Sequence, residues 1–268
     1  MNSKDPEYSA AVDRLRREGL ALENLVASLS DDQWQLETPA VGWTIAHQIG
    51  HLWWTDGAAL AALGGAEEFA PYFQDALSRP FTLTDDTAAE ATKLGPAELL
   101  TRWRTRRNEL AEKLENADLN ERYPWFGPPM RARSMVTARI METWAHGQDI
   151  YDTVGSTRPA SAALRDISHL GVITQQFCFQ INELAPPEEP VRVEVHSDGE
   201  TWSWGPEDAT NRITGSATDF CLMVTQRREL DELDLDITGP VAAQWAEIAQ
   251  AFAGPPKSVV RAQQHKNQ

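Results

Sequence analysis

Residues 42–51 of this chain read GWTIAHQIGH, and residues 141–149 read METWAHGQD. Each stretch places two side chains that can bind a metal ion four residues apart, which is about one turn of an α-helix. The pairs are His47 with His51 and Glu142 with His146. Helical bundles build metal sites by directing such faces at one another. The two stretches therefore predict a bundle of helices with a metal site in its interior.

The apolar pattern around these stretches predicts four long helices, with breaks at glycines and prolines between them. The expected helices cover residues 7–28, 44–63, 96–117 and 133–154. The segment between the second and the third contains Pro71 and Pro80 and is expected to hold one short helix. Four long helices joined by loops are typical of an antiparallel bundle, which we assign to residues 1–158.

The pattern changes after residues 155–159. A further helix is expected first, and then short segments of period-two alternation flank Asp198-Gly199, which is typical of a β-hairpin. The expected order is helix 161–184, strands 191–195, 201–204 and 211–214, helix 217–228, strand 233–237 and helix 241–253. The whole chain is thus predicted to be α+β, with a small α+β domain at residues 159–256 and a polar, disordered tail at 257–268.

The composition of the chain narrows the classes of function to be considered. The formal net charge of −16 over 268 residues would repel nucleic acid, and no apolar run is long enough to cross a bilayer or to act as a signal sequence. We expect a cytoplasmic protein with neither nucleic acid nor membrane as a partner. Cys178 and Cys221 lie in apolar stretches and are expected to be buried. A thiol needed for chemistry would therefore come from another molecule.

The most economical metal-binding set is His51, Glu142 and His146, because three protein ligands leave a coordination position open for catalysis. One alternative for Glu142 and His146 is an ion pair on a solvated helix surface, but apolar residues surround them in the sequence. A buried network of salt bridges is the other alternative. For the histidines of the first stretch, ordinary hydrogen-bonded positions are an alternative too. Zinc suits the set; iron(II) and nickel are alternatives.

The chain also resembles a known family. Gly42-Trp43-Thr44 followed by His51, together with the second stretch and with residues 214–220, 227, 238–240 and 245, is similar to the mycothiol-dependent maleylpyruvate isomerase family. That family belongs to the DinB-like group of metal-binding four-helix bundles. The resemblance extends over nearly the whole chain. It implies a DinB-like bundle followed by the family's C-terminal domain.

The resemblance implies roles for individual residues. His51, Glu142 and His146 would bind zinc, Asp149 would be an active-site acid, and Arg227 would reach the site from the C-terminal domain. Arg227 could bind a carboxylate of the substrate or of the thiol cofactor, or it could be an exposed arginine at a helix end. His47 departs from the commoner pattern and could be an alternative ligand or a catalytic proton carrier.

The resulting hypothesis is an enzyme that uses zinc and a low-molecular-weight thiol, by resemblance mycothiol, on a small electrophile that could carry a carboxylate. The thiolate would add to an activated double bond and allow cis–trans isomerisation, or would be transferred as in a thiol S-transferase. The alternatives are a metal-binding protein without catalysis and a zinc-dependent hydrolase with Asp149 as base. The chain is expected to act as a monomer or a homodimer.

Two further features have open interpretations. The aromatic and proline-rich segment 123–130 leads into the predicted metal-binding helix and could line a pocket or serve as a packed connection. Arg102, Arg104, Arg106 and Arg107 are expected on the solvated face of their helix.

Overall fold

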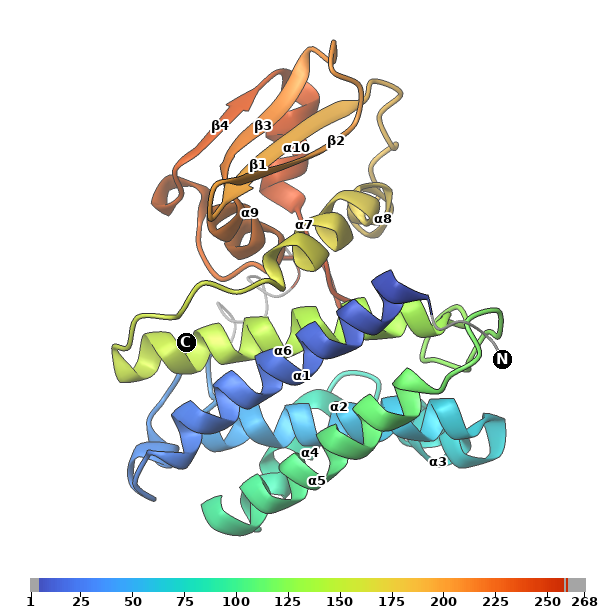
Figure 1. Cartoon of the computed structure of the whole chain (residues 1–268), viewed down its shortest axis with the longest axis vertical. Coiled ribbons are helices and arrows are strands. Elements are labelled where there is room, and N and C mark those ends of the chain that lie inside the picture. The colour runs from blue at the N-terminus through green and yellow to red at the C-terminus, as the bar shows by residue number, and fades with distance from the viewer. Residues whose placement is uncertain (1–4, 258, 260–268) are drawn as a thin grey trace. The chain divides into compact units, whose positions relative to one another are not determined.

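The computed structural model describes residues 5–257 and residue 259, and these form two compact units divided between Pro159 and Ala160. Ten α-helices and one small four-stranded sheet lie within the described residues (Figure 1). This helix-rich α+β architecture confirms the predicted fold class. Among the described residues, no helix has the length and apolar character needed to cross a membrane.

The first unit contains six of the α-helices. They are α1 (Pro6–Ala27), α2 (Ile45–Gly64), α3 (Ala66–Ser78), α4 (Leu83–Thr92), α5 (Pro96–Glu115) and α6 (Ala132–Val154), with a short 3-10 turn at Gln33–Gln35. The four long helices α1, α2, α5 and α6 form the bundle, and α2 packs against α5 and α6. The segment expected to hold one short helix forms both α3 and α4, with Pro71 inside α3.

The helices of the bundle run in two directions (Figure 1). α2 and α6 are antiparallel, as are α1 and α5, where the Tyr8 hydroxyl near the start of α1 donates to the carbonyl of Leu114 near the end of α5 (2.6 Å). α2 and α5 run the same way, because α3 and α4 return the chain along the bundle before α5 begins. The antiparallel pair α2 and α6 carries the two stretches singled out in the sequence.

A buried polar network joins three of these helices. Asp56 on α2 accepts hydrogen bonds from Arg139 Nε on α6 (3.0 Å) and from Trp103 Nε1 on α5 (3.2 Å). All three side chains are buried. Arg139 also donates to Thr55 Oγ1, which in turn donates to the carbonyl of His51. The network therefore ties the helix that carries His51 to α5 and α6.

One sequence prediction about the arginines is wrong. Arg107 is buried rather than solvated, since its guanidinium lies against α1 and donates to the carbonyl of Gly19 (2.6 Å) and to Glu23. A Cβ at Gly19 would lie 2.6 Å from Arg107 Cδ. Because Gly19 has no side chain, α1 leaves room for the arginine. The neighbouring Arg102 and Arg104 are exposed, as predicted.

The second unit is a sheet with helices packed on it. Its strands are β1 (Val191–Ser197), β2 (Glu200–Trp204), β3 (Asn211–Ser216) and β4 (Leu235–Thr238), in the order β2-β1-β3-β4. β1 and β2 form the predicted antiparallel hairpin, and β1 pairs in parallel with β3. Val191, Val193 and Val195 of β1 are buried between less buried neighbours, which is the alternation expected of a strand with one covered face.

Four helices complete this unit: α7 (Leu164–Ile173), α8 (Gln175–Ile181), α9 (Ala217–Val224) and α10 (Pro240–Ile248). α9 packs on β1 and β3, and α10 packs on β3 and β4. The single helix expected over 161–184 is broken at Thr174, which separates α7 from α8. Cys178 and Cys221 are buried free thiols, as predicted. Of the tail expected at 257–268, all but Lys257 and Val259 lies outside the described residues.

Candidate metal centre

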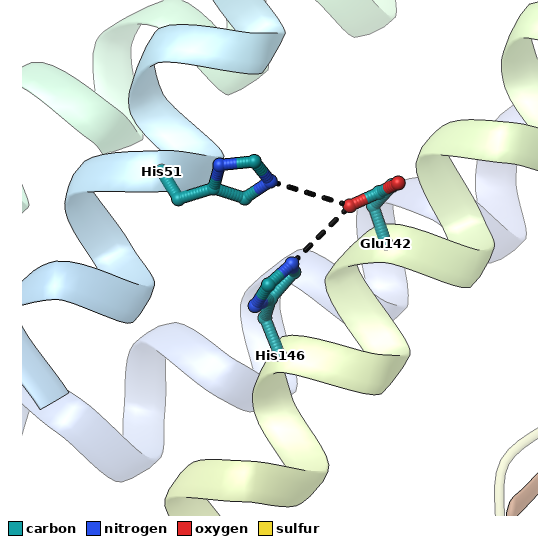
Figure 2. A group of neighbouring side chains, drawn as sticks. All are labelled: His51, Glu142 and His146. Carbon is teal, nitrogen blue, oxygen red and sulfur yellow. Dashed lines mark ion pairs between the residues drawn. The ribbon is translucent and has the colours of Figure 1, made fainter. Parts of the chain in front are cut away.

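The side chains of His51, Glu142 and His146 meet between α2 and α6 (Figure 2). His51 Nε2 lies 3.5 Å and His146 Nε2 lies 3.2 Å from the same oxygen of Glu142, Oε2. One nitrogen or oxygen atom from each residue lies within 4.8 Å of the other two. Among the described residues this is the group of histidine, cysteine and acidic side chains whose geometry suits a metal ion.

Helical periodicity explains this convergence. Glu142 and His146 are one turn apart on α6 and therefore point to the same side. His51 enters from α2, which faces α6 along the bundle. His51 is 9% exposed, and the side chains of His146 and Glu142 are 12% and 21% exposed. The group is thus largely withdrawn from water, and Glu142 is its most exposed member.

The charge of Glu142 is stabilised by the two histidines. Burial by itself raises the pKa of this carboxyl, but hydrogen bonds and positive charge from His146 and His51 outweigh it and hold the pKa well below its ordinary value. An ionised carboxylate with two imidazole nitrogens is a suitable donor set for zinc or iron(II).

The two ring nitrogens of His51 have different surroundings. Its Nδ1 is buried and makes no hydrogen bond with any described residue. The other nitrogen, Nε2, faces the carboxylate oxygen of Glu142, and this ion pair orients the imidazole toward the candidate metal centre. Three donor atoms that converge this closely need a positive charge among them, which a proton or a metal ion can supply.

An aromatic residue covers the histidines. The ring of Trp43, just before α2, lies 5.3 Å from the ring of His51 and 5.9 Å from that of His146, and it stacks on the latter. Its indole N–H donates to Asp85 Oδ1 of α4 (2.8 Å). This hydrogen bond fixes the ring over one side of the site.

Gln48 is the residue of the site that the sequence did not indicate. It is fully buried, with Oε1 2.5 Å from His146 Nδ1 and Nε2 2.9 Å from Thr38 Oγ1. Thr38 Oγ1 in turn donates to the carbonyl of Trp43 (2.8 Å). A glutamine inside a helix carries no motif, so only its spatial position beside a histidine reveals it.

His47 has a structural contact in addition to its predicted role. Its Nδ1 accepts from the backbone N–H of Thr44 (3.2 Å) and lies 2.8 Å from Thr44 Oγ1, which closes a capping box at the start of α2. Burial lowers its pKa, and the charge of Asp85 opposes that shift. His47 is not part of the group that meets at Glu142. Its service as a proton carrier stays a prediction.

Asp149 and Arg227 lie in different units. Asp149 is buried on α6, one turn beyond His146, and its carbonyl accepts from Thr153 Oγ1 (2.7 Å). Arg227 follows α9 in the second unit and donates from Nη1 to the carbonyl of Thr225 (2.6 Å). The catalytic role of Asp149 and the approach of Arg227 to the metal centre stay predictions.

The comparison with protein families decides the affiliation. A family model described as the mycothiol maleylpyruvate isomerase N-terminal domain matches residues 15–151, more than half of the chain, and this range contains the whole candidate metal centre. The chain belongs to this family. A second model, described as wyosine base formation, matches residues 187–236 in the second unit and covers too little of the chain to assign a function.

Proteins similar to this chain are found among both sequences and solved structures. An uncharacterized protein of Mycobacterium tuberculosis, recorded in strains CDC 1551 and H37Rv, is 53% identical over 90% of this chain and 95% of its own length. A crystal structure of the mycothiol-dependent maleylpyruvate isomerase matches 82% of this chain and 90% of that chain with a TM-score of 0.58 at 14% identity. A histidine-to-alanine variant of that isomerase matches with a TM-score of 0.59 at 12% identity. At such low identities, the TM-scores show a shared fold and nothing more.

The segment between α5 and α6 carries a second aromatic group beside α2 and α3. The ring of Phe126 stacks on Trp54 of α2 (5.8 Å), and that of Trp125 stacks on Phe69 of α3 (6.0 Å). The backbone of the segment is closed by paired hydrogen bonds between Tyr123 and Met130. The rings contact one another and the aromatic residues of α2 and α3, as a packed connection would.

Proposed function

We propose that this chain is a metal-dependent enzyme that uses mycothiol, a low-molecular-weight thiol, to act on a small electrophilic substrate. The observation that carries the proposal is the convergence of His51, Glu142 and His146 within 4.8 Å inside the domain that defines the family. The isomerase whose fold the chain shares is described as mycothiol-dependent, which supports the choice of thiol.

The residues of the chain would divide the work as follows. His51, Glu142 and His146 would hold a divalent ion, preferably zinc, through two nitrogens and a carboxylate oxygen. An ion held there supplies the charge that keeps a thiol as the thiolate, the nucleophile for addition to an activated double bond or for S-transfer. Trp43 would keep water from one side of the two imidazoles.

Two acid–base side chains and one positively charged side chain complete the proposed site. Asp149, buried one turn from His146, would handle a proton near the ion. His47 would carry a proton through Nε2, since its Nδ1 is engaged by Thr44. Arg227 would bind a carboxylate of the substrate or of the thiol by paired N–H···O bonds.

The test combines metal analysis with a thiol-dependent assay. Purified protein and its Glu142→Gln variant are measured for bound zinc, iron and nickel, and for isomerisation of maleylpyruvate and S-transfer to electrophiles with and without mycothiol. Glu98→Gln is the matched control, because Glu98 is exposed and forms an ion pair with Arg102 on the surface of α5, away from the candidate metal centre. We expect Glu142→Gln to lose the metal and at least about 100-fold of the turnover, and the control to keep both.

Each outcome has a definite meaning. Full thiol-dependent turnover in a metal-free Glu142→Gln protein would refute the proposed site. Metal binding with no turnover of any electrophile would identify a metal-binding protein without catalysis. Metal-dependent cleavage of esters or amides without any thiol would identify a hydrolase.

A further inference from the structure

Gln48 is a fully buried amide whose position the metal ligands and their proposed chemistry do not explain. It lies one turn before His51 on α2 and reaches across to α6. Burying a primary amide is unfavourable unless its donors and acceptor are satisfied. It contacts His146 on one side and Thr38 on the other, so the amide bridges a proposed metal ligand and the turn before α2.

The carbonyl of Trp43, at the far end of this bridge, determines which atom donates and which accepts in each hydrogen bond. The carbonyl oxygen of Trp43 can only accept, so Thr38 must donate its hydroxyl proton to it (2.8 Å). Having given that proton, Thr38 Oγ1 is left as an acceptor. It therefore accepts from the amide of Gln48, which places Nε2 toward Thr38 (2.9 Å) and Oε1 toward His146.

The orientation of the amide fixes the proton on His146. Gln48 Oε1 is an acceptor, so the facing nitrogen, Nδ1 at 2.5 Å, must carry a proton and donate it. The other nitrogen, Nε2, then faces Glu142 Oε2 at 3.2 Å and is the atom available to a metal ion. With the proton on the wrong nitrogen, Nε2 would present an N–H to the ion and could not bind it.

We propose that Gln48 is a positioning residue that, through a one-way hydrogen-bond relay from the Trp43 carbonyl through Thr38, fixes His146 with Nδ1 protonated and Nε2 directed at the metal. The inference rests on the proposed metal site and adds how one ligand is prepared for it. Trp43 acts twice in this arrangement, since its ring also stacks on the His146 imidazole at 5.9 Å. The ring plane and the protonated nitrogen are thus fixed from two directions.

The two histidine ligands differ in this respect. His51 Nδ1 makes no hydrogen bond with any described residue, so the relay supports His146 alone. Loss of Gln48 should therefore change the imidazole of His146 and leave that of His51 as it is. A general loosening of the bundle would affect both, which gives the test its internal comparison.

The experiment uses the full chain with Gln48→Leu, which keeps the volume and removes the acceptor, and Gln48→Glu, which restores an acceptor. Gln74→Leu is the matched control, because Gln74 is an exposed helical glutamine on α3. Zinc affinity is measured by competition with a chelator, and imidazole nitrogens are observed by long-range ¹H–¹⁵N NMR with and without zinc. We expect Gln48→Leu to weaken zinc binding about 10- to 100-fold, as loss of a partner to a ligand histidine does. Gln48→Glu should restore most of the affinity.

NMR gives the result that a merely structural glutamine would not produce. We expect a protonated Nδ1 on His146 in the parent protein both with and without zinc, and a changed Nδ1 signal with faster proton exchange in Gln48→Leu only at His146. An unprotonated Nδ1, or zinc affinity and His146 signals unchanged by Gln48→Leu, would overturn the inference. If the parent protein binds no zinc, the proposed function fails while the zinc-free spectra still decide the relay. If Gln48→Leu fails to fold, the Gln48→Glu protein decides: an unprotonated Nδ1 on His146 in that variant overturns the relay.

Discussion

Replacing Asp56 by Asn tests the buried network that supports the helices of the metal centre. Asp56 is 4% exposed and its partner Arg139 is 3% exposed, so the substitution removes a negative charge but almost no volume from the interior. The guanidinium of Arg139 carries a positive charge. The variant therefore keeps a buried positive charge without its counter-ion, next to Trp103 and Thr55.

The size of the effect follows from that uncompensated charge. Breaking one partner of a buried ion pair costs about 3–5 kcal/mol of the free energy of unfolding. For a unit of this size, 1 kcal/mol changes the melting temperature by about 2–4 °C. We therefore expect Asp56→Asn to lower the melting temperature of the first unit by about 6–20 °C.

The assay is thermal unfolding at pH 7 together with hydrogen exchange of α2, α5 and α6, which reports the first unit separately. Asp75→Asn is the matched control, because Asp75 of α3 pairs with Arg79, the residue that follows this helix, and both side chains are partly exposed. Exposed pairs contribute about 0–1 kcal/mol, so the control should shift melting by a few degrees at most. A cost for Asp56→Asn no larger than that of the control would refute the reasoning. Replacing Asp56 by Leu and Arg139 by Met together should recover much of the loss, since no charge is then left buried.

Three further outcomes are expected. Because burial lowers the pKa of His47 below 6.5, the stability that its neutral ring gives to α2 is complete above about pH 6.5 and falls as the pH drops through the lowered pKa; His47→Gln keeps the Thr44 cap and should remove this slope from urea titrations at pH 5–8. Gly239→Ala should cost about 1–3 kcal/mol in urea unfolding of the second unit, because φ is +89° and the new Cβ would lie 2.4 Å from Asn211 Oδ1; unchanged stability would contradict this. Zinc at 100 times its dissociation constant should stabilise the protein by about 2.7 kcal/mol, an increment that a chelator abolishes and that Glu142→Gln lacks in calorimetry.

Much of the fold follows from periodicity that is local in the sequence. The spacing of Glu142 and His146 places both on one face of any helix, and the alternation of residues 191–195 and 201–204 around Asp198-Gly199 predicts a hairpin wherever the strands lie. Such patterns identify elements and the faces of elements. These patterns also pointed to the three side chains that meet at the candidate centre, because few charged residues lie on helix faces that are otherwise apolar.

The features that the sequence did not reveal depend on contacts between distant segments. Arg107 is buried because Gly19, 88 residues away, leaves space on α1. The break between α7 and α8 at Thr174 interrupts a sequence with no glycine or proline at that point. The role of Gln48 depends on His146, 98 residues away on another helix. None of these features produces a periodic pattern of apolar residues, so a single sequence does not show them.

The N-terminus of α2 shows how neighbouring residues come to serve different purposes. Successive side chains on a helix point about 100° apart. His47 is therefore directed back to Thr44, where it caps the helix, while Gln48 is directed into the bundle toward His146. The preceding turn, closed by the Thr38 N–H donating to the Trp43 carbonyl (2.8 Å), holds both arrangements.

Trp43 contributes to the site in two separate ways, through its ring and through its main-chain carbonyl. Its ring covers the histidines, whereas its carbonyl anchors the relay through Thr38 and belongs to the main chain. Trp43→Phe would lose the hydrogen bond to Asp85 and part of the ring contact, but every residue at this position supplies the same carbonyl. The protonated Nδ1 of His146 should therefore persist in Trp43→Phe and change in Gln48→Leu, and the NMR signal of that nitrogen distinguishes cover from relay.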